Sequence, residues 1–170
     1  MIRLDSVLDS WKTVRQDTAQ SVEDFPGAEL DFKPTKDVMT FREIARHILD
    51  AGHALTGLML DGVEDLQTPQ FREMVGRYVA ELPETPDAAS LAAELRRNVE
   101  MRAAQLAGRP PDFFAHVITR FDGQRVTRLE MLQFAKEHEL THRAQLFLYL
   151  RLKGIVPATT RRRLAKQQRA

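Results

Sequence analysis

Apolar side chains recur every three or four residues through four long segments of the chain, and this spacing predicts four amphipathic helices. The segments cover residues 3–24, 40–62, 87–107 and 127–153. The second and fourth segments each begin with a Thr-x-x-Glu pattern, at Thr40 and at Thr127, which is typical of a capped helix N-terminus. Four long helices in one chain predict an all-α four-helix bundle.

The connections between these segments are too long for tight helical hairpins, which favours a connectivity other than a simple up-and-down order. Residues 25–37 contain two prolines and one glycine and are expected to form a loop. A shorter helix is predicted around residues 70–81. The Asp122-Gly123 pair predicts a tight turn, so we expect an irregular segment or a short hairpin before the last helix.

The composition is that of a single globular domain of 170 residues, with 43% hydrophobic and 29% charged residues. The longest unbroken apolar run, residues 146–150, is far too short to span a membrane. The first twelve residues include Asp5 and Asp9 and lack the apolar stretch of a secretory signal. We therefore expect a cytoplasmic protein without a membrane partner.

The chain contains no cysteine. This excludes disulfides, a thiolate nucleophile and any cysteine-ligated zinc or iron–sulfur site. If the protein handles thiols, the sulfur must arrive on a substrate.

Charge is distributed unevenly along the chain. The segment 159–170 carries five basic residues and no acidic ones, whereas the remainder has 20 basic against 24 acidic residues. A mildly acidic body argues against a dedicated nucleic-acid binder. We accordingly divide the chain into a bundle domain at residues 1–158 and a basic, flexible C-terminal tail at residues 159–170.

Three of the five histidines are predicted to face the bundle interior. His138 and His142 lie about 40° apart on the apolar face of the last long helix, and His47 lies on the apolar face of the second. Burying three imidazoles in an apolar layer is costly unless each finds a partner, and one divalent cation satisfies all three at once. Three neutral imidazoles with an open fourth position are also typical of catalytic zinc. The sequence therefore predicts a metal site at His47, His138 and His142.

The other two histidines are not predicted to be ligands. His53 lies about 120° around the second helix from His47, so we expect it at the surface or at an interface. His116 falls in the irregular segment, where the sequence indicates no partner.

Two other metal sites were considered. Residues 138–142 read HELTH, the H-E-x-x-H pattern of metalloproteases, but such enzymes take a third ligand downstream, and no Asp, Glu or His follows His142. A di-iron carboxylate site needs two Glu-x-x-His motifs and two further glutamates. The chain has only Glu139 to His142, and its nearest second copy, Asp50 to His53, faces elsewhere.

Two segments, REIARHILDAGH (42–53) and EHELTHRAQLFLYLRLKGIVP (137–157), resemble the DinB-like superfamily of bacterial four-helix-bundle proteins. The resemblance implies an up-down-down-up bundle, a frequent homodimer, and one divalent metal, usually zinc or nickel, held at His47, His138 and His142. Characterised branches of that superfamily include thiol S-transferases and an isomerase that use low-molecular-weight thiols such as bacillithiol and mycothiol.

From the residues and the resemblance together, we predict a protein that uses a divalent metal to activate a low-molecular-weight thiol against an electrophilic small molecule. A metal-dependent hydrolase and a non-enzymatic, stress-related metal-binding protein are the alternatives. No general acid or base is identified. Glu43 and Asp50 are close enough to His47 to be its partners, but the favoured interpretation is that they are surface helix carboxylates. Gln145 and Tyr149 could line a pocket. An outward apolar line formed by Leu140, Ala144 and Phe147 suggests a dimer contact.

Overall fold

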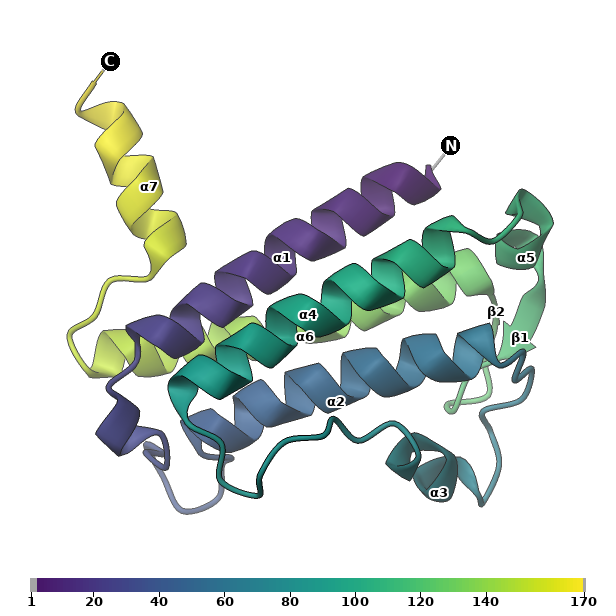
Figure 1. Cartoon of the computed structure of the whole chain (residues 1–170), viewed down its shortest axis with the longest axis horizontal. Coiled ribbons are helices and arrows are strands. Elements are labelled where there is room, and N and C mark those ends of the chain that lie inside the picture. The colour runs from purple at the N-terminus through teal and green to yellow at the C-terminus, as the bar shows by residue number, and fades with distance from the viewer. Residues whose placement is uncertain (1–2, 170) are drawn as a thin grey trace.

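The computed structural model describes residues 3–169 and contains the four predicted long helices (Figure 1). They are α1 (Leu4–Asp24), α2 (Phe41–Leu60), α4 (Ala88–Ala107) and α6 (Arg128–Leu152). Both predicted capping boxes are present: the hydroxyls of Thr40 and Thr127 accept the backbone N–H three residues on, and the glutamates at those positions accept the backbone N–H of the threonines. The all-α fold class is confirmed.

The helices pack as a ring in which α1 and α2 each contact α4 and α6. In Figure 1, α1 and α6 run in one direction and α2 and α4 in the other, which is the expected up-down-down-up order. Because α2 and α4 are parallel, the chain between them must return along the whole bundle. Residues 61–87 make this crossover and include the short helix α3 (Phe71–Gly76).

Smaller elements close the ends of the bundle. They are the 3-10 helix η1 (Gly27–Glu29), helix α5 (Pro111–Ala115), and strands β1 (Val117–Thr119) and β2 (Arg125–Thr127). The two strands pair antiparallel, and Gly123 in their turn has a φ of +83°, a conformation that favours glycine. The hairpin predicted from Asp122-Gly123 is therefore confirmed.

Two apolar clusters form the core, one toward each end of the bundle. On α6, Ala135 belongs to one cluster and Leu146 to the other. The polar residues His138, Glu139 and His142 lie between them along the same helix. The middle of the bundle is thus a polar layer, and the candidate site lies within it.

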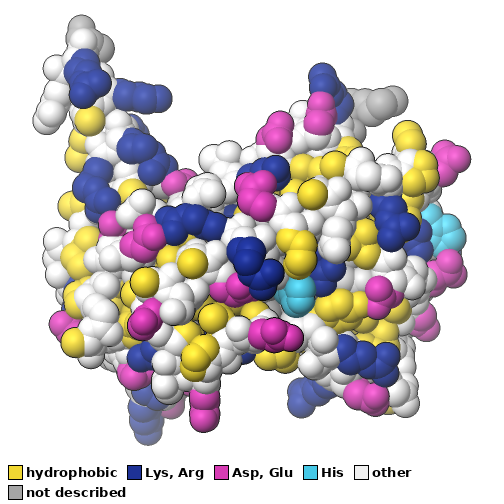
Figure 2. Space-filling view, viewed as in Figure 1, with side chains coloured by type: hydrophobic (Ala, Val, Ile, Leu, Met, Phe, Trp, Pro, Cys, Tyr) yellow, Lys and Arg dark blue, Asp and Glu magenta, His cyan; other side chains and the backbone are white. Residues whose placement is uncertain are grey.

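The C-terminal segment differs from the flexible tail predicted at 159–170. Residues Ala158–Gln167 form helix α7, which leaves the bundle at an angle and carries many of its Lys and Arg side chains outward (Figures 1 and 2). Two arginines attach it to α1, Arg161 through Asp24 at 2.8 Å and Arg162 through Asp17. Residues 158–169 contain neither glycine nor proline, the two residues that most disfavour a helix interior. Pro157 stands directly before the first residue of the helix. Residue 170 lies outside the described residues.

Within residues 3–169, no helix is both long enough and apolar enough to cross a membrane.

Candidate metal centre

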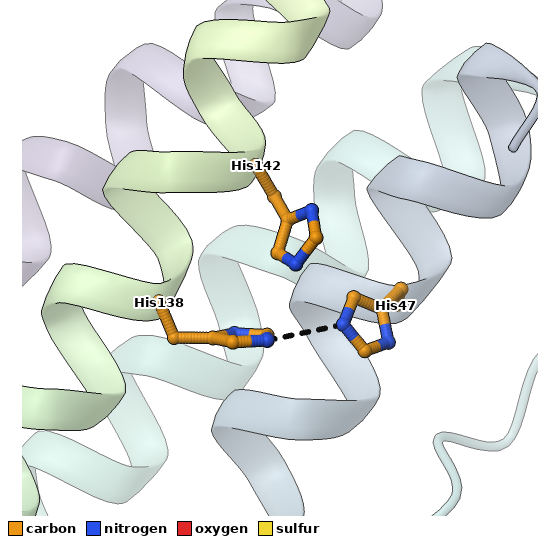
Figure 3. A group of neighbouring side chains, drawn as sticks. All are labelled: His47, His138 and His142. Atoms are coloured by element: carbon orange, nitrogen blue, oxygen red, sulfur yellow. Dashed lines mark hydrogen bonds between the residues drawn. The ribbon is translucent and has the colours of Figure 1, made fainter. Parts of the chain in front are cut away.

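Helices α2 and α6 bring His47, His138 and His142 together at the middle of the bundle (Figure 3). One ring nitrogen from each histidine lies within 4.8 Å of the other two. The shortest separation, 3.1 Å, joins Nε2 of His47 to Nε2 of His138. The three histidines that the sequence singles out thus form one cluster, although they come from segments 91 residues apart.

The donor set fits a divalent cation of the zinc type. Nitrogen ligands in a tetrahedral zinc site lie about 2.0–2.1 Å from the metal, which places them roughly 3.3 Å from each other. The 3.1 Å separation of His47 and His138 is close to that spacing. Among the described residues, no carboxylate belongs to the cluster, and an all-imidazole set suits zinc and nickel better than magnesium or calcium.

Burial favours the neutral form of two of the cluster imidazoles, His47 and His138. Burial lowers the pKa of His138 to about 4, and repulsion from His142 and His47 acts in the same direction. Burial, followed by repulsion from His142, also lowers the pKa of His47. At neutral pH both rings therefore carry a free lone pair, as a metal ligand requires.

Gln145 orients His142. Its Oε1 lies 2.7 Å from Nδ1 of His142, and with this oxygen as acceptor the ring must donate from Nδ1 and carry its lone pair on Nε2. Gln145 therefore holds a cluster residue in place instead of lining a pocket. The expectation for Tyr149 is wrong as well, since this side chain is buried and its hydroxyl donates to the carbonyl of Met39 at 2.9 Å.

Glu139, the glutamate of the HELTH motif, faces α1 and not the histidines. It is only 2% exposed and accepts hydrogen bonds from Trp11 Nε1 at 2.9 Å, Arg15 Nε at 2.8 Å and the Thr18 hydroxyl at 2.8 Å. Since all three donors come from α1, the Glu139 carboxylate stabilises the packing of α6 on α1 and is not directed toward the histidine cluster. The protease interpretation fails on this geometry. The sequence reasoning missed the network, although Arg15 and Thr18 follow Trp11 at helical spacing.

The two carboxylates expected near His47 have other partners. Glu43 accepts the backbone N–H of Thr40 as part of the capping box. Asp50 pairs with Arg46 at 2.9 Å and accepts the backbone N–H of Ala80 at 3.0 Å. Neither forms a hydrogen bond with His47 within the described part of the chain, so the alternative that they are partners of His47 is not supported.

The remaining histidines lie apart from the cluster. His53 is half-buried against α4, with its Nδ1 2.6 Å from Asn98 Nδ2 and 3.2 Å from Arg102 Nε, which corrects the expectation of a surface or interface position. Burial and the charge of Arg102 lower the pKa of His53 to about 4. His116 is paired with Glu64 at 2.8 Å, a contact that the sequence did not indicate.

Two pockets share His47. The first, of about 190 Å³, is bordered by His47 and His138 and otherwise lined by apolar side chains from α2, α3, α6 and the hairpin turn. The second, of about 260 Å³, is lined mainly by charged side chains, namely Arg42, Glu43, Arg46, Asp50 and Glu84. The cluster therefore lies where an apolar pocket and a polar pocket meet.

The outward apolar line predicted on the last helix is interrupted. Ala144 is exposed, but Leu140 and Phe147 are partly buried, and the ring of Phe147 packs against the core. The large apolar side chains that α6 exposes are Leu148 and Leu152, each 54% exposed. The homodimer stays a prediction.

An up-down-down-up bundle with one histidine from α2 and an i, i+4 pair from α6 defines a class of three-histidine helical bundles. The chain belongs to the DinB family, whose family model matches residues 1–169. It is 26% identical to the uncharacterised protein YjoA of Bacillus subtilis over 155 residues, which are 91% of this chain and 93% of YjoA.

Several solved structures share the fold of this chain. The DinB-like YjoA structure matches with a TM-score of 0.68 at 23% identity, covering 88% of this chain and 92% of YjoA. YfiT of Bacillus subtilis, described as a probable metal-dependent hydrolase with an unusual four-helix bundle topology, matches with a TM-score of 0.70 at 19% identity, covering 91% of both chains. A mycothiol-dependent maleylpyruvate isomerase matches with a TM-score of 0.63 at 15% identity, covering 85% of this chain and 61% of the isomerase.

Proposed function

We propose that His47, His138 and His142 hold one divalent cation, zinc or nickel, and that the protein uses it to activate a low-molecular-weight thiol against an electrophile. The observation that carries the proposal is the convergence of three imidazoles, two of which border an apolar pocket. Three protein ligands leave at least one position of a four-coordinate ion for substrate.

A bound cation would lower the pKa of a coordinating thiol enough to make it a thiolate at neutral pH. The protein's own residues supply geometry: α2 and α6 hold the imidazoles, and Gln145 fixes the ring of His142. The polar pocket beside His47 offers room for the polar part of a thiol. In the transfer, the thiol sulfur bonds to the electrophilic carbon, the bond from carbon to its leaving group breaks, and the thiol proton departs with that group.

A thiol suits the site better than water does. Hydrolysis commonly needs a general base beside the attacking water. No carboxylate lines the apolar pocket, and two carboxylates of the polar pocket are engaged, Glu43 in the cap of α2 and Asp50 with Arg46. Glu139 is bound to α1 and cannot serve. A thiol, with an ordinary pKa of about 8.5, needs less assistance, and a chain without cysteine must receive its sulfur from a substrate. The fold shared with a mycothiol-dependent enzyme makes mycothiol and bacillithiol the first candidates.

Hydrolysis is the second candidate, supported by the similarity to YfiT, which is described as a probable metal-dependent hydrolase. Metal-replete protein should be incubated with one electrophile, such as benzyl chloride, with and without mycothiol, bacillithiol and cysteine. We expect metal-dependent consumption of a thiol above the uncatalysed rate. Turnover of ester or amide substrates without any thiol would instead favour hydrolysis. If neither occurs and chelation only lowers the melting temperature, the non-enzymatic alternative holds.

The metal assignment has a separate test. In His47→Ala, His138→Ala and His142→Ala, the metal content measured by plasma mass spectrometry should fall well below one ion per chain, because each variant lacks one of three ligands. His53→Ala is the matched control, since His53 lies on α2 but bonds to α4, and it should keep full occupancy. Unchanged metal content in all three cluster variants would disprove the assignment.

A further inference from the structure

A continuous aromatic wall leads from the surface to the histidine cluster. Phe71 of α3 stacks on Phe121 of the hairpin turn with ring centroids 5.4 Å apart, and Phe121 meets Phe134 of α6 at 5.6 Å. The Phe134 ring lies 6.4 Å from the ring of His138. Leu55 and Val75 complete the apolar lining of the 190 Å³ pocket. A molecule in this pocket therefore contacts hydrocarbon along its length and imidazole at one end.

The pocket offers no partner for a charged group. Its lining contains no Asp, Glu, Lys or Arg. The nearby Arg120 lies over the Phe134 ring at 4.8 Å but does not line the pocket, and it is paired with Asp122. A charged group placed among these apolar side chains, away from the cation proposed at the histidines, would lose its hydration without gaining a counter-ion, which disfavours binding.

The pocket also limits the size of its ligand. An apolar cavity of roughly 150 Å³ accommodates one benzene molecule. A pocket of about 190 Å³ therefore has room for one substituted ring or a branched hydrocarbon group of similar size. Larger polycyclic groups do not fit without movement of the walls.

We propose that this pocket is the acceptor subsite, and that it selects uncharged electrophiles bearing one aromatic ring or a compact branched hydrocarbon group. This inference rests on the proposed thiol transfer and specifies its second substrate. The hydrocarbon group lies against Phe71, Phe121 and Phe134, which directs the reactive carbon toward His47 and His138. Electrophiles with a carboxylate on the ring are excluded by the uncharged lining.

Binding of fluorobenzene to the metal-replete protein, followed by fluorine NMR line broadening, tests the subsite without any turnover. Val75→Trp fills the pocket from the half-buried side of α3 and should weaken binding at least tenfold. Val79→Trp is the matched control, because Val79 is 51% exposed and does not line the pocket, and it should bind as the unmodified protein does. Phe121→Ala, at a partly exposed wall residue, should also weaken binding. Equal affinity in Val75→Trp and the unmodified protein would overturn the proposal.

Selectivity is tested with two electrophiles that share a reactive carbon, benzyl chloride and 4-(chloromethyl)benzoate. With the same thiol, the KM of the carboxylated compound should be at least tenfold higher, and Val75→Trp should reduce the difference. Equal KM values for the two compounds, measured with active enzyme, would disprove the acceptor subsite but would not contradict the proposed thiol transfer. Conversely, pocket-dependent binding of fluorobenzene by a protein that consumes no thiol would support the subsite and count against the proposed function.

Discussion

Glu139 and His138 are adjacent in the sequence, but their side chains contact different helices. His138 faces α2, whereas the Glu139 carboxylate is surrounded by donors from α1. Successive residues on a helix point about 100° apart, so one motif can serve two interfaces. In this chain the histidines of HELTH belong to the cluster and the glutamate belongs to the packing of α6 on α1.

Replacing Glu139 by Gln should destabilise the protein without removing metal. The substitution leaves the buried Arg15 guanidinium without its counter-charge, and breaking a buried ion pair typically costs about 3–5 kcal/mol. We expect the free energy of unfolding, measured in urea, to fall by an amount in this range, while metal content at low temperature stays unchanged. Glu137→Gln, at an exposed position on the same helix, should change stability by less than about 0.5 kcal/mol. Loss of metal from folded Glu139→Gln protein would contradict this assignment.

Tyr78, just after the short helix α3, is one of the aromatic side chains that hold this helix against the bundle. Tyr78 follows α3, donates its hydroxyl hydrogen bond to Asp61, and packs its ring 5.6 Å from the ring of His53. The ring lies against Gly57 of α2, where an added Cβ would be only 2.3 Å from Tyr78 Cε1. The space beside Gly57 thus sets the position of Tyr78 and of the helix α3 that precedes it. Because α3 supplies Phe71 and Val75 to the apolar pocket, the same space also affects the position of that pocket wall.

Gly57→Ala should therefore destabilise the protein although alanine favours helices. The helical preference gains about 1 kcal/mol, but forcing the Tyr78 ring outward costs about 1–3 kcal/mol. We expect a net loss of about 1 kcal/mol in urea unfolding, with altered fluorescence of Tyr78. Gly76→Ala, where an added Cβ meets nothing within 4 Å, should be neutral or stabilising. A stabilised Gly57→Ala variant would show that the Tyr78 ring does not pack against Gly57.

Local sequence signals predict the long helices, but they do not predict which side chains from distant parts of the chain contact each other. The 3.6-residue periodicity and the capping boxes at Thr40 and Thr127 act within one helix, so they predict its ends. The hairpin and the inward direction of each of the three histidines follow from equally local signals, whereas their convergence depends on the packing of α2 on α6. By contrast, the partners of Glu139 lie 121–128 residues away and those of His53 lie 45–49 residues away, and no local pattern identifies them. The helix α7 was missed because a run of basic residues was interpreted as solvated coil.

At the scale of the whole molecule, α7 is an appendage of the bundle. Arg161 and Arg162 pair with Asp24 and Asp17 of α1, and the Thr160 hydroxyl accepts a hydrogen bond from Arg151 of α6. Most residues of α7 are exposed. The five basic residues of segment 159–170, four of which lie in α7, change the balance of an otherwise mildly acidic chain. The bundle core does not depend on α7.

Ending the chain after Ala158 should accordingly leave the fold and the metal content intact. Exposed ion pairs contribute about 0–1 kcal/mol each, so the two pairs lost predict a decrease of at most about 2 kcal/mol in the free energy of unfolding. We expect a small drop in melting temperature by calorimetry and weaker retention on a cation-exchange column. Failure of the shortened chain to fold would show that the bundle does depend on α7.

The distance along the chain between the clustered histidines has a mechanical consequence. His47 and His138 are separated by 91 residues, and this chain has no cysteine with which to tie distant segments together. An ion held jointly by α2 and α6 would act as a reversible cross-link that closes this long loop. In a chain-entropy description, closing a loop of about this length corresponds to roughly 4–5 kcal/mol. The stability of the fold would then depend on the concentration of available metal ions.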